Sequence, residues 1–222
     1  MSAQHTDLID QVLSITPGSR LDGLRRHREV ARDNIQSAYL ALFEPRDVTQ
    51  VTLLERLAVA SFVAGLHGQI VLADHYAHRL SLSQGGPVLA ALLAAEIDAG
   101  EAKGPYGIYP AGPLSAENQA GPHYRVGADS RRLIGAKLSA ALEHAHLLVF
   151  RPRDASREAL QALLDAGWST AAIVTLSQLV AYLAFQVRIV SGLAALASSS
   201  EQPVAANSDA TFTAALAAGV NS

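Results

Sequence analysis

The chain of 222 residues contains no cysteine, and this absence excludes several kinds of chemistry. Disulfide bonds, thiolate metal sites and cysteine nucleophiles all require a sulfur that is not there. Aromatic residues are also scarce, at 5% of the sequence, whereas hydrophobic residues make up 50%. No segment shows the sustained alternation of apolar and polar residues that is typical of strands. Alanine and leucine are frequent and lose little on entering a helix, so the composition predicts an all-α fold.

Clustered positive charge is missing as well. The formal net charge is −3 and no long basic run occurs. We therefore expect no nucleic-acid partner, because phosphate binding needs a basic surface. The N-terminal residues, MSAQHTDLIDQ, lack the basic start and the apolar run of a secretory signal. These absences lead us to expect a cytoplasmic protein.

One long apolar run is present. Residues 173–197 read IVTLSQLVAYLAFQVRIVSGLAALA, which is long enough to cross a bilayer. Gln178, Gln186 and Arg188 interrupt this run. An arginine near the middle of a membrane span costs roughly 2.5–3.5 kcal/mol. We therefore interpret the run as a buried or interface helix and expect no membrane partner.

Apolar residues at helical spacing recur along most of the chain, separated by turn and cap residues. We expect one helical domain over residues 1–197, with a core motif at 52–84 and a second helical unit at 130–197. A mobile low-complexity tail is expected at 198–222. The two units resemble each other weakly, which suggests duplicated helical halves. The expected helices are 6–15, 24–43, 53–66, 69–84, 87–99, 130–149, 157–166 and 170–197, with Asp22, Thr49 or Thr52, Ser156 and Ser169 as N-caps.

Residues 100–127 interrupt the helical pattern with a stretch rich in glycine, proline and tyrosine. Loops of this length are uncommon and are usually either functional or disordered. Tyr106, Ile108, Tyr109 and Tyr124 argue against disorder, because a solvated linker has no need of such side chains. We therefore expect an ordered loop that covers a pocket or crosses to another subunit.

The stretch from Glu55 to Tyr76, ERLAVASFVAGLHGQIVLADHY, resembles the core motif of the carboxymuconolactone decarboxylase and alkylhydroperoxidase D superfamily. The similarity extends over most of residues 20–197 and points to a subgroup of longer, peroxidase-related proteins. It implies an alkylhydroperoxidase D-like helical bundle and a homo-oligomer. In the redox enzymes of this family, two cysteines follow the turn. Here Gln69 and Leu72 stand in their places, so the thiol-peroxidase mechanism is excluded.

The remaining polar residues of the motif suggest a proton relay. Glu55 matches the family's glutamate and His75 the first of its paired histidines, whereas Tyr76 replaces the second. His78 shares a helix face with His75, and His67 lies in the turn. We expect a small organic molecule to bind near these residues, with Glu55 as base and a histidine or tyrosine of the group as its partner. No cofactor is expected.

Several alternatives stay open for the same residues. Glu55 and Thr52 also fit a capping box, in which the glutamate only satisfies amides at a helix start. The histidines could be solvated or core residues. A metal site built from Glu55, His75 and His78 is the weaker interpretation, because His-x-x-His on a helix is not a typical zinc spacing.

Four further polar residues lie in the C-terminal half. Gln186 and Arg188 are interpreted first as structural hydrogen-bonding groups or a subunit salt bridge, and only second, for Arg188, as a substrate contact. His144 and His146 alternate along a helix, so they point apart and are poor co-ligands.

Two classes of function follow from the resemblance and the missing sulfurs. The chain is either an enzyme that acts on a small organic molecule or a non-catalytic subunit that partners an active, cysteine-bearing relative. The absence of both sulfurs within an intact helical frame motivates the second hypothesis.

Overall fold

The computed structural model describes residues 7–199, and every regular element in this part of the chain is helical. The one strand-like pairing in this range is an isolated antiparallel bridge between Gly107 and Gln119. The prediction of an all-α fold is therefore confirmed. In chain order the elements are α1 (Leu8–Val12), α2 (Arg20–Arg26), α3 (Glu29–Phe43), α4 (Leu53–Leu66), α5 (Ile70–Ser81), α6 (Gly86–Ala99), the 3₁₀ turn η1 (Pro113–Glu117), α7 (Ala128–Phe150), the 3₁₀ turn η2 (Pro152–Asp154), α8 (Arg157–Asp165) and α9 (Thr170–Ser198).

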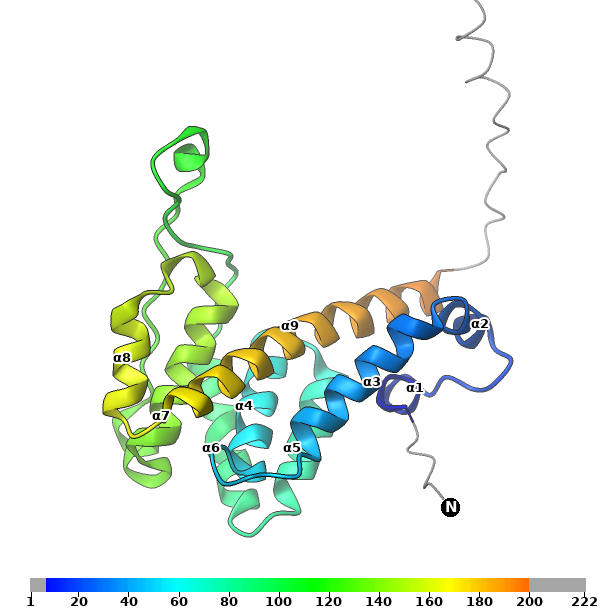
Figure 1. Ribbon diagram of the computed structural model, residues 1–222, viewed down its shortest axis with the longest axis horizontal. Coiled ribbons are helices and arrows are strands. Elements are labelled where there is room, and N and C mark those ends of the chain that lie inside the picture. Colours follow the sequence, from blue (N-terminus) through cyan, green and yellow to red (C-terminus); the bar gives the residue numbers. More distant parts are fainter. Residues whose placement is uncertain (1–6, 200–222) are drawn as a thin grey trace, which may run out of the picture.

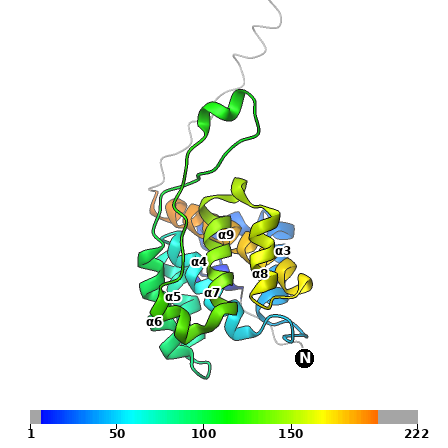
Figure 2. The ribbon, with the colours of Figure 1, turned by 90° about the vertical axis from the view of Figure 1, so that its left-hand side faces the viewer.

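Helix α4 lies at the centre of the fold, and every residue from Arg56 to Ala64 is buried. Its sequence is apolar on all sides, which is typical of a helix surrounded by protein. The helices that pack against it are α5, α6, α7 and α9, and Figure 2 shows α4 among them. The charged head of Arg56 is satisfied within the protein, because it donates to the carbonyl oxygens of Val51 and Leu42 at 3.0 and 2.9 Å.

The N-terminal helices differ from the prediction in two ways. Ser19, and not Asp22, is the N-cap of α2, because the Ser19 hydroxyl accepts the backbone amide of Asp22. The Asp22 carboxylate instead accepts the amide of Gly18 at 2.8 Å. The single helix expected over 24–43 is also interrupted. At Arg28 the backbone leaves the helical region, with φ −121° and ψ 49°, so α2 and α3 are separate helices.

The charged segment 25–33 is not simply a solvated face. Arg25 is 7% exposed and forms ion pairs with Asp10 and, at 2.8 Å, with Asp7. Arg32 also pairs with Asp10. A run of charged residues usually indicates a solvated face, but Arg25 is buried because α1 and its N-cap place two carboxylates against it.

Residues 100–127 form an arm that rises from the helical body in both views (Figures 1 and 2). Hydrogen bonds hold the base of the arm to the body. The amide of Tyr106 donates to the carbonyl oxygen of Phe150 at 2.6 Å, and the hydroxyl of Tyr124 donates to Glu96 Oε2 at 2.6 Å. The short turn η1 lies in the outer part of the arm, away from the helices (Figure 2).

The second half of the chain contains two long helices. Helix α7 kinks at Gly135, where φ is 83° and ψ is 164°. Helix α9 is continuous to Ser198, one residue beyond the expected end of the domain, and residues 200–222 of the predicted tail lie outside the described part. The suggested duplication is not reflected in local conformation, since the chain turns at Gly68 between α4 and α5 whereas α9 has no such turn.

Helices α7 and α9 are both long and apolar enough to cross a membrane by length and composition. The core helix of a soluble protein meets the same criterion, and one side of each helix is packed against the body here. The buried polar residue of α9 has the partner that the sequence required, because Gln186 is 0% exposed and accepts the hydroxyl of Tyr76. Arg188 is exposed and needs no buried partner.

Gly86, at the start of α6, provides a test of the packing around α5 and α6. A Cβ atom at Gly86 would lie 1.9 Å from the backbone oxygen of Leu80. We predict that Gly86→Ala lowers the free energy of unfolding by about 2–3 kcal/mol, because the turn between the helices must open. Urea denaturation followed by circular dichroism measures this loss.

Gly23→Ala is the matched control, because an added Cβ at Gly23 meets nothing within 4 Å. Alanine is preferred over glycine inside a helix by roughly 0.5–1 kcal/mol, so this variant should be equally or more stable than the parent. Similar effects of the two substitutions would contradict the close contact at Gly86.

Candidate functional site

The carboxylate of Glu55 lies at the start of α4 and is occupied by structural contacts. One oxygen accepts the backbone amide and the hydroxyl of Thr52 at 2.8 and 3.0 Å, which completes a capping box. The other oxygen pairs with Lys137 Nζ of α7 at 2.8 Å. Within residues 7–199, none of its hydrogen bonds or ion pairs reaches His75. The expected base and its expected partner are therefore not in contact.

The two positions that match the family's cysteines face other helices. Gln69 is the N-cap of α5, and its side-chain amide donates to Ser191 Oγ of α9 at 2.8 Å. Leu72 is fully buried in the core. His67 lies in the turn, where burial and then the charge of Arg188 lower its pKa. Arg188 is exposed and donates to a carbonyl oxygen of its own helix at 2.6 Å, so its hydrogen bond is structural.

His75 and His78 lie on one helix face but differ in burial. His75 is half-buried, with Nε2 3.4 Å from the hydroxyl of Tyr39 and its ring edge-on to Tyr76. Burial, followed by the charges of Arg79 and His78, lowers the pKa of His75 to about 4. His78 is exposed. An imidazole with so low a pKa is a weak base at neutral pH, because catalytic bases work best with a pKa near the operating pH.

Tyr76 belongs to a buried polar network that joins α5, α9 and α3. Its hydroxyl donates to Gln186 Oε1 at 2.6 Å, and Gln186 Nε2 donates to the hydroxyl of Tyr182 at 3.3 Å. The Tyr182 hydroxyl donates in turn to the carbonyl oxygen of Ile35 at 3.4 Å. Burial raises the pKa of Tyr76 well above its usual value, so the phenol stays protonated. The network satisfies buried polar groups and holds the helices together.

The residues expected in one site thus fall into two places. His75, Tyr76 and His78 lie together on α5, whereas Glu55 and its cap lie at the contact of α4 with α7. In the part of the chain that the structure describes, no group of three or more histidine, aspartate or glutamate residues is placed to hold a metal ion.

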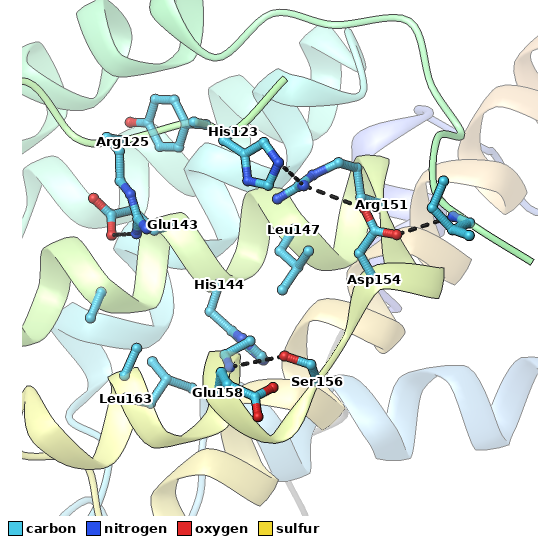
Figure 3. Close-up of a pocket in the computed structure, with 15 residues that line it drawn as sticks. His123, Arg125, Glu143, His144, Leu147, Arg151, Asp154, Ser156, Glu158 and Leu163 are labelled. Carbon is cyan, nitrogen blue, oxygen red and sulfur yellow. Dashed lines mark hydrogen bonds and ion pairs between the residues drawn. The ribbon is translucent and has the colours of Figure 1, made fainter. Parts of the chain in front are cut away.

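A cavity of about 490 Å³ lies instead between α7, α8 and the base of the arm (Figure 3). Its volume is within the usual range for small-molecule sites. The arm forms part of the wall, which agrees with the expectation that this loop covers a pocket. The lining residues from α7 and its end are Ala140, Glu143, His144, Leu147 and Arg151, and those from the arm are Ile108, His123, Tyr124 and Arg125.

Arg151 follows α7 and is the most buried cation in the cavity wall, with 9% of its side chain exposed. Its Nη1 donates to His123 Nε2 at 3.0 Å and to Asp154 Oδ2 at 3.3 Å. The first bond requires His123 Nε2 to be the unprotonated nitrogen, because a guanidinium can only donate. The Nε of Arg151 is buried and has no hydrogen-bond partner in the described part of the chain. Leaving such a donor unpaired costs about 1–3 kcal/mol, so an oxygen brought to it would be stabilised.

His144 is the second buried group of the wall without a hydrogen bond. The residue is 5% exposed, and neither ring nitrogen has a hydrogen-bond partner among the residues that the structure describes. Burial lowers the pKa of His144, so the ring is neutral at pH 7 and offers one donor and one acceptor. In Figure 3 the ring points from α7 toward Ser156 at the start of α8. His146 points elsewhere, with Nε2 2.9 Å from the carbonyl oxygen of Gly100, as the alternation predicted.

Two carboxylates of the wall are already paired. Glu143 accepts Arg125 at 2.8 Å and also contacts Arg131. Asp154 accepts Arg151 and the amide of Ile108, the latter at 3.1 Å. The groups that need partners are therefore a guanidinium N–H and a neutral imidazole. Such a pair can bind a small molecule that carries an acceptor oxygen at one end and a hydroxyl at the other.

This cavity is not among the sites expected from the sequence, although the sequence contains a pattern that is consistent with it. His144, Leu147 and Arg151 recur at the spacing of one helix face. His144 and His146 point apart and cannot bind one ion, but this does not exclude another role for His144 alone. The spacing alone cannot show that α8 and the arm leave a hollow beside this face.

The polar network around Tyr76 can be tested because removing one partner of a buried hydrogen bond costs more stability than removing both. We predict that Tyr76→Phe lowers the free energy of unfolding by about 1–3 kcal/mol, because Gln186 Oε1 then stays buried without a donor. Adding Gln186→Leu should recover part of this loss, since both partners are then removed. Tyr109→Phe, on the arm, is a control expected to change stability by less than about 0.5 kcal/mol. Strictly additive losses in the double variant would contradict the coupling.

The low pKa of His75 predicts a dependence of stability on pH. The folded protein keeps His75 neutral down to about pH 4, whereas the unfolded chain binds a proton below about 6.5. Stability that is present above pH 6.5 is therefore lost as the pH falls toward 4. We expect His75→Gln to reduce the loss between pH 7 and pH 5 by about 1–2 kcal/mol. Urea denaturation at both pH values measures it, and identical pH profiles for variant and parent would contradict it.

Comparisons with models of protein families, with curated proteins and with solved structures find no match to this chain.

Proposed function

We propose that this chain is a small-molecule-binding protein of the alkylhydroperoxidase D-like type, in which the cysteine positions of the family are structural and the ligand occupies the cavity beside α7. The family part of the proposal rests on the resemblance of residues 55–76 and on the helical hairpin of α4 and α5 that they form. The ligand is a small organic acid that also carries a hydroxyl group.

One observation carries the proposal. Arg151 Nε and both ring nitrogens of His144 are buried, have no hydrogen-bond partner within residues 7–199, and belong to residues that line a cavity of about 490 Å³. Buried polar groups in folded proteins are nearly always hydrogen-bonded, and an exception calls for an explanation. A ligand carboxylate at Arg151 Nε and a ligand hydroxyl at one ring nitrogen of His144 would give both residues a hydrogen-bond partner.

The contacts around α4 and α5 support the choice of the cavity over the relay. Glu55 is bound to Thr52 and Lys137, and Tyr76 to Gln186, so their polar atoms are already used. The side-chain amide of Gln69 likewise donates to Ser191 Oγ. A hairpin whose polar groups hold helices together also suits a non-catalytic subunit beside a cysteine-bearing relative, in which case the cavity would stay empty.

Three probes test the ligand class. 4-Hydroxybenzoate carries both groups, benzoate only the carboxylate and phenol only the hydroxyl. We expect isothermal titration calorimetry to show the tightest binding for 4-hydroxybenzoate. Arg151→Met should weaken its binding by about 10–100-fold, because a hydrogen bond to a charged group is worth about 1.5–3 kcal/mol. His144→Phe should abolish the preference for 4-hydroxybenzoate over benzoate.

Glu55→Gln is the matched control, since Glu55 lies outside the cavity wall. This variant should bind 4-hydroxybenzoate as the parent does. Loss of binding in Glu55→Gln, with binding kept in Arg151→Met, would return the ligand to the residues around Glu55. Binding of none of the three probes by a folded parent would overturn the proposal and favour the subunit role.

A further inference from the structure

Helix α9 exposes one regular stripe along most of its length. Eight exposed residues, from Ala171 to Ala195, follow one another at alternate intervals of three and four. This is the heptad spacing at which two helices pack side chains into each other's gaps. The opposite side of α9 is buried against the body, and Figure 1 shows none of the other described helices in front of the middle of α9.

The stripe is apolar apart from Gln178 and Arg188. Its two large apolar side chains, Val174 and Phe185, are 53% and 49% exposed. The other positions are alanine or glycine, and no atom lies within 4 Å of the place of a Cβ at Gly192. A continuous exposed apolar surface of this length marks an interaction site more often than a free surface.

The stripe is also symmetric about Leu183. The stripe residues that lie two, five, nine and twelve positions before Leu183 are Ala181, Gln178, Val174 and Ala171. Those at the same distances after it are Phe185, Arg188, Gly192 and Ala195. A two-fold axis at this point would place Phe185 of one copy on Ala181 of the other, and Val174 on Gly192. A large side chain meets a small one in both pairs, so the face is complementary to itself.

The polar residues of the stripe favour the same arrangement. In the antiparallel pairing Arg188 of one copy faces Gln178 of the other, whose side-chain oxygen can accept its N–H groups. In a parallel pairing Arg188 would face Arg188 of the second copy, and the two positive charges would repel each other. The antiparallel orientation is therefore preferred on charge as well as on size.

We propose that the exposed stripe of α9 is a homodimer interface, on which a second copy of this chain binds with its α9 antiparallel and the two-fold axis at Leu183. By a rise of 1.5 Å per residue, the contact is about 36 Å long. A single helix pair buries less than the roughly 1,600 Å² of a standard interface, so we expect a weak dimer that dissociates on dilution.

The absence of native cysteine allows the orientation to be tested by cross-linking. Val174→Cys and Gly192→Cys are made in separate full-length chains, one of which carries a tag that increases its mass. The chains are mixed and oxidised with diamide. We expect the disulfide mainly between the two different chains. Disulfides that join only identical chains would show a parallel pair and overturn the proposal. In the antiparallel pair, residues 174 of the two copies are about 27 Å apart and cannot form a disulfide.

Sedimentation over a series of concentrations tests the face itself. Phe185→Lys should shift the monomer–dimer midpoint to at least tenfold higher concentration, because it puts charge into the centre of the stripe. Val88→Lys is the matched control, since Val88 is 64% exposed on α6 and outside the stripe; its midpoint should be that of the parent. The proposal is overturned if the parent protein is a monomer at every concentration, or if its dimer is unaffected by Phe185→Lys. It is also overturned if the parent protein binds phosphatidylcholine vesicles and does not dimerise.

Discussion

The burial of α4 on all its sides is the constraint on which the rest of the fold depends. A helix surrounded by protein must approach its neighbours through small side chains. Gly65 shows how close the approach is, because a Cβ there would lie 2.5 Å from the side chain of Ile97 on α6. The polar residues at the start of α4 also have partners within the protein: Glu55 caps the helix and binds Lys137, and Arg56 binds two carbonyl oxygens.

The same constraint explains why the motif that resembles a family active site serves packing here. Three polar residues of the α4–α5 hairpin connect it to other helices: Glu55 binds Lys137 of α7, and Gln69 and Tyr76 bind Ser191 and Gln186 of α9. The open volume lies on the other side of α7, where α8 and the arm meet. There Arg151 and His144 are buried without full hydrogen bonding, which is the condition that a ligand can relieve.

Local features were the most predictable part of this structure. The capping box at Thr52, the start of α5 after Gln69 and the cap at Ser169 depend on atoms only a few residues apart, so the sequence contains all the information. The N-terminal region was harder to predict. Both Ser19 and Asp22 can cap a helix, and the burial of Arg25 depends on carboxylates brought by α1. A competing cap and a distant partner cannot be weighed from spacing alone.

By itself, the sequence determined the all-helical class, most helix ends and the exclusion of thiol chemistry, because these follow from composition, periodicity and the side chains present. Only the tertiary structure decided which polar residues lie together. It separated Glu55 from the histidines of α5 and placed His144 and Arg151 on one cavity. The physical reason is that helical spacing determines the face on which a residue lies, whereas the partner of that face depends on elements far away in the chain.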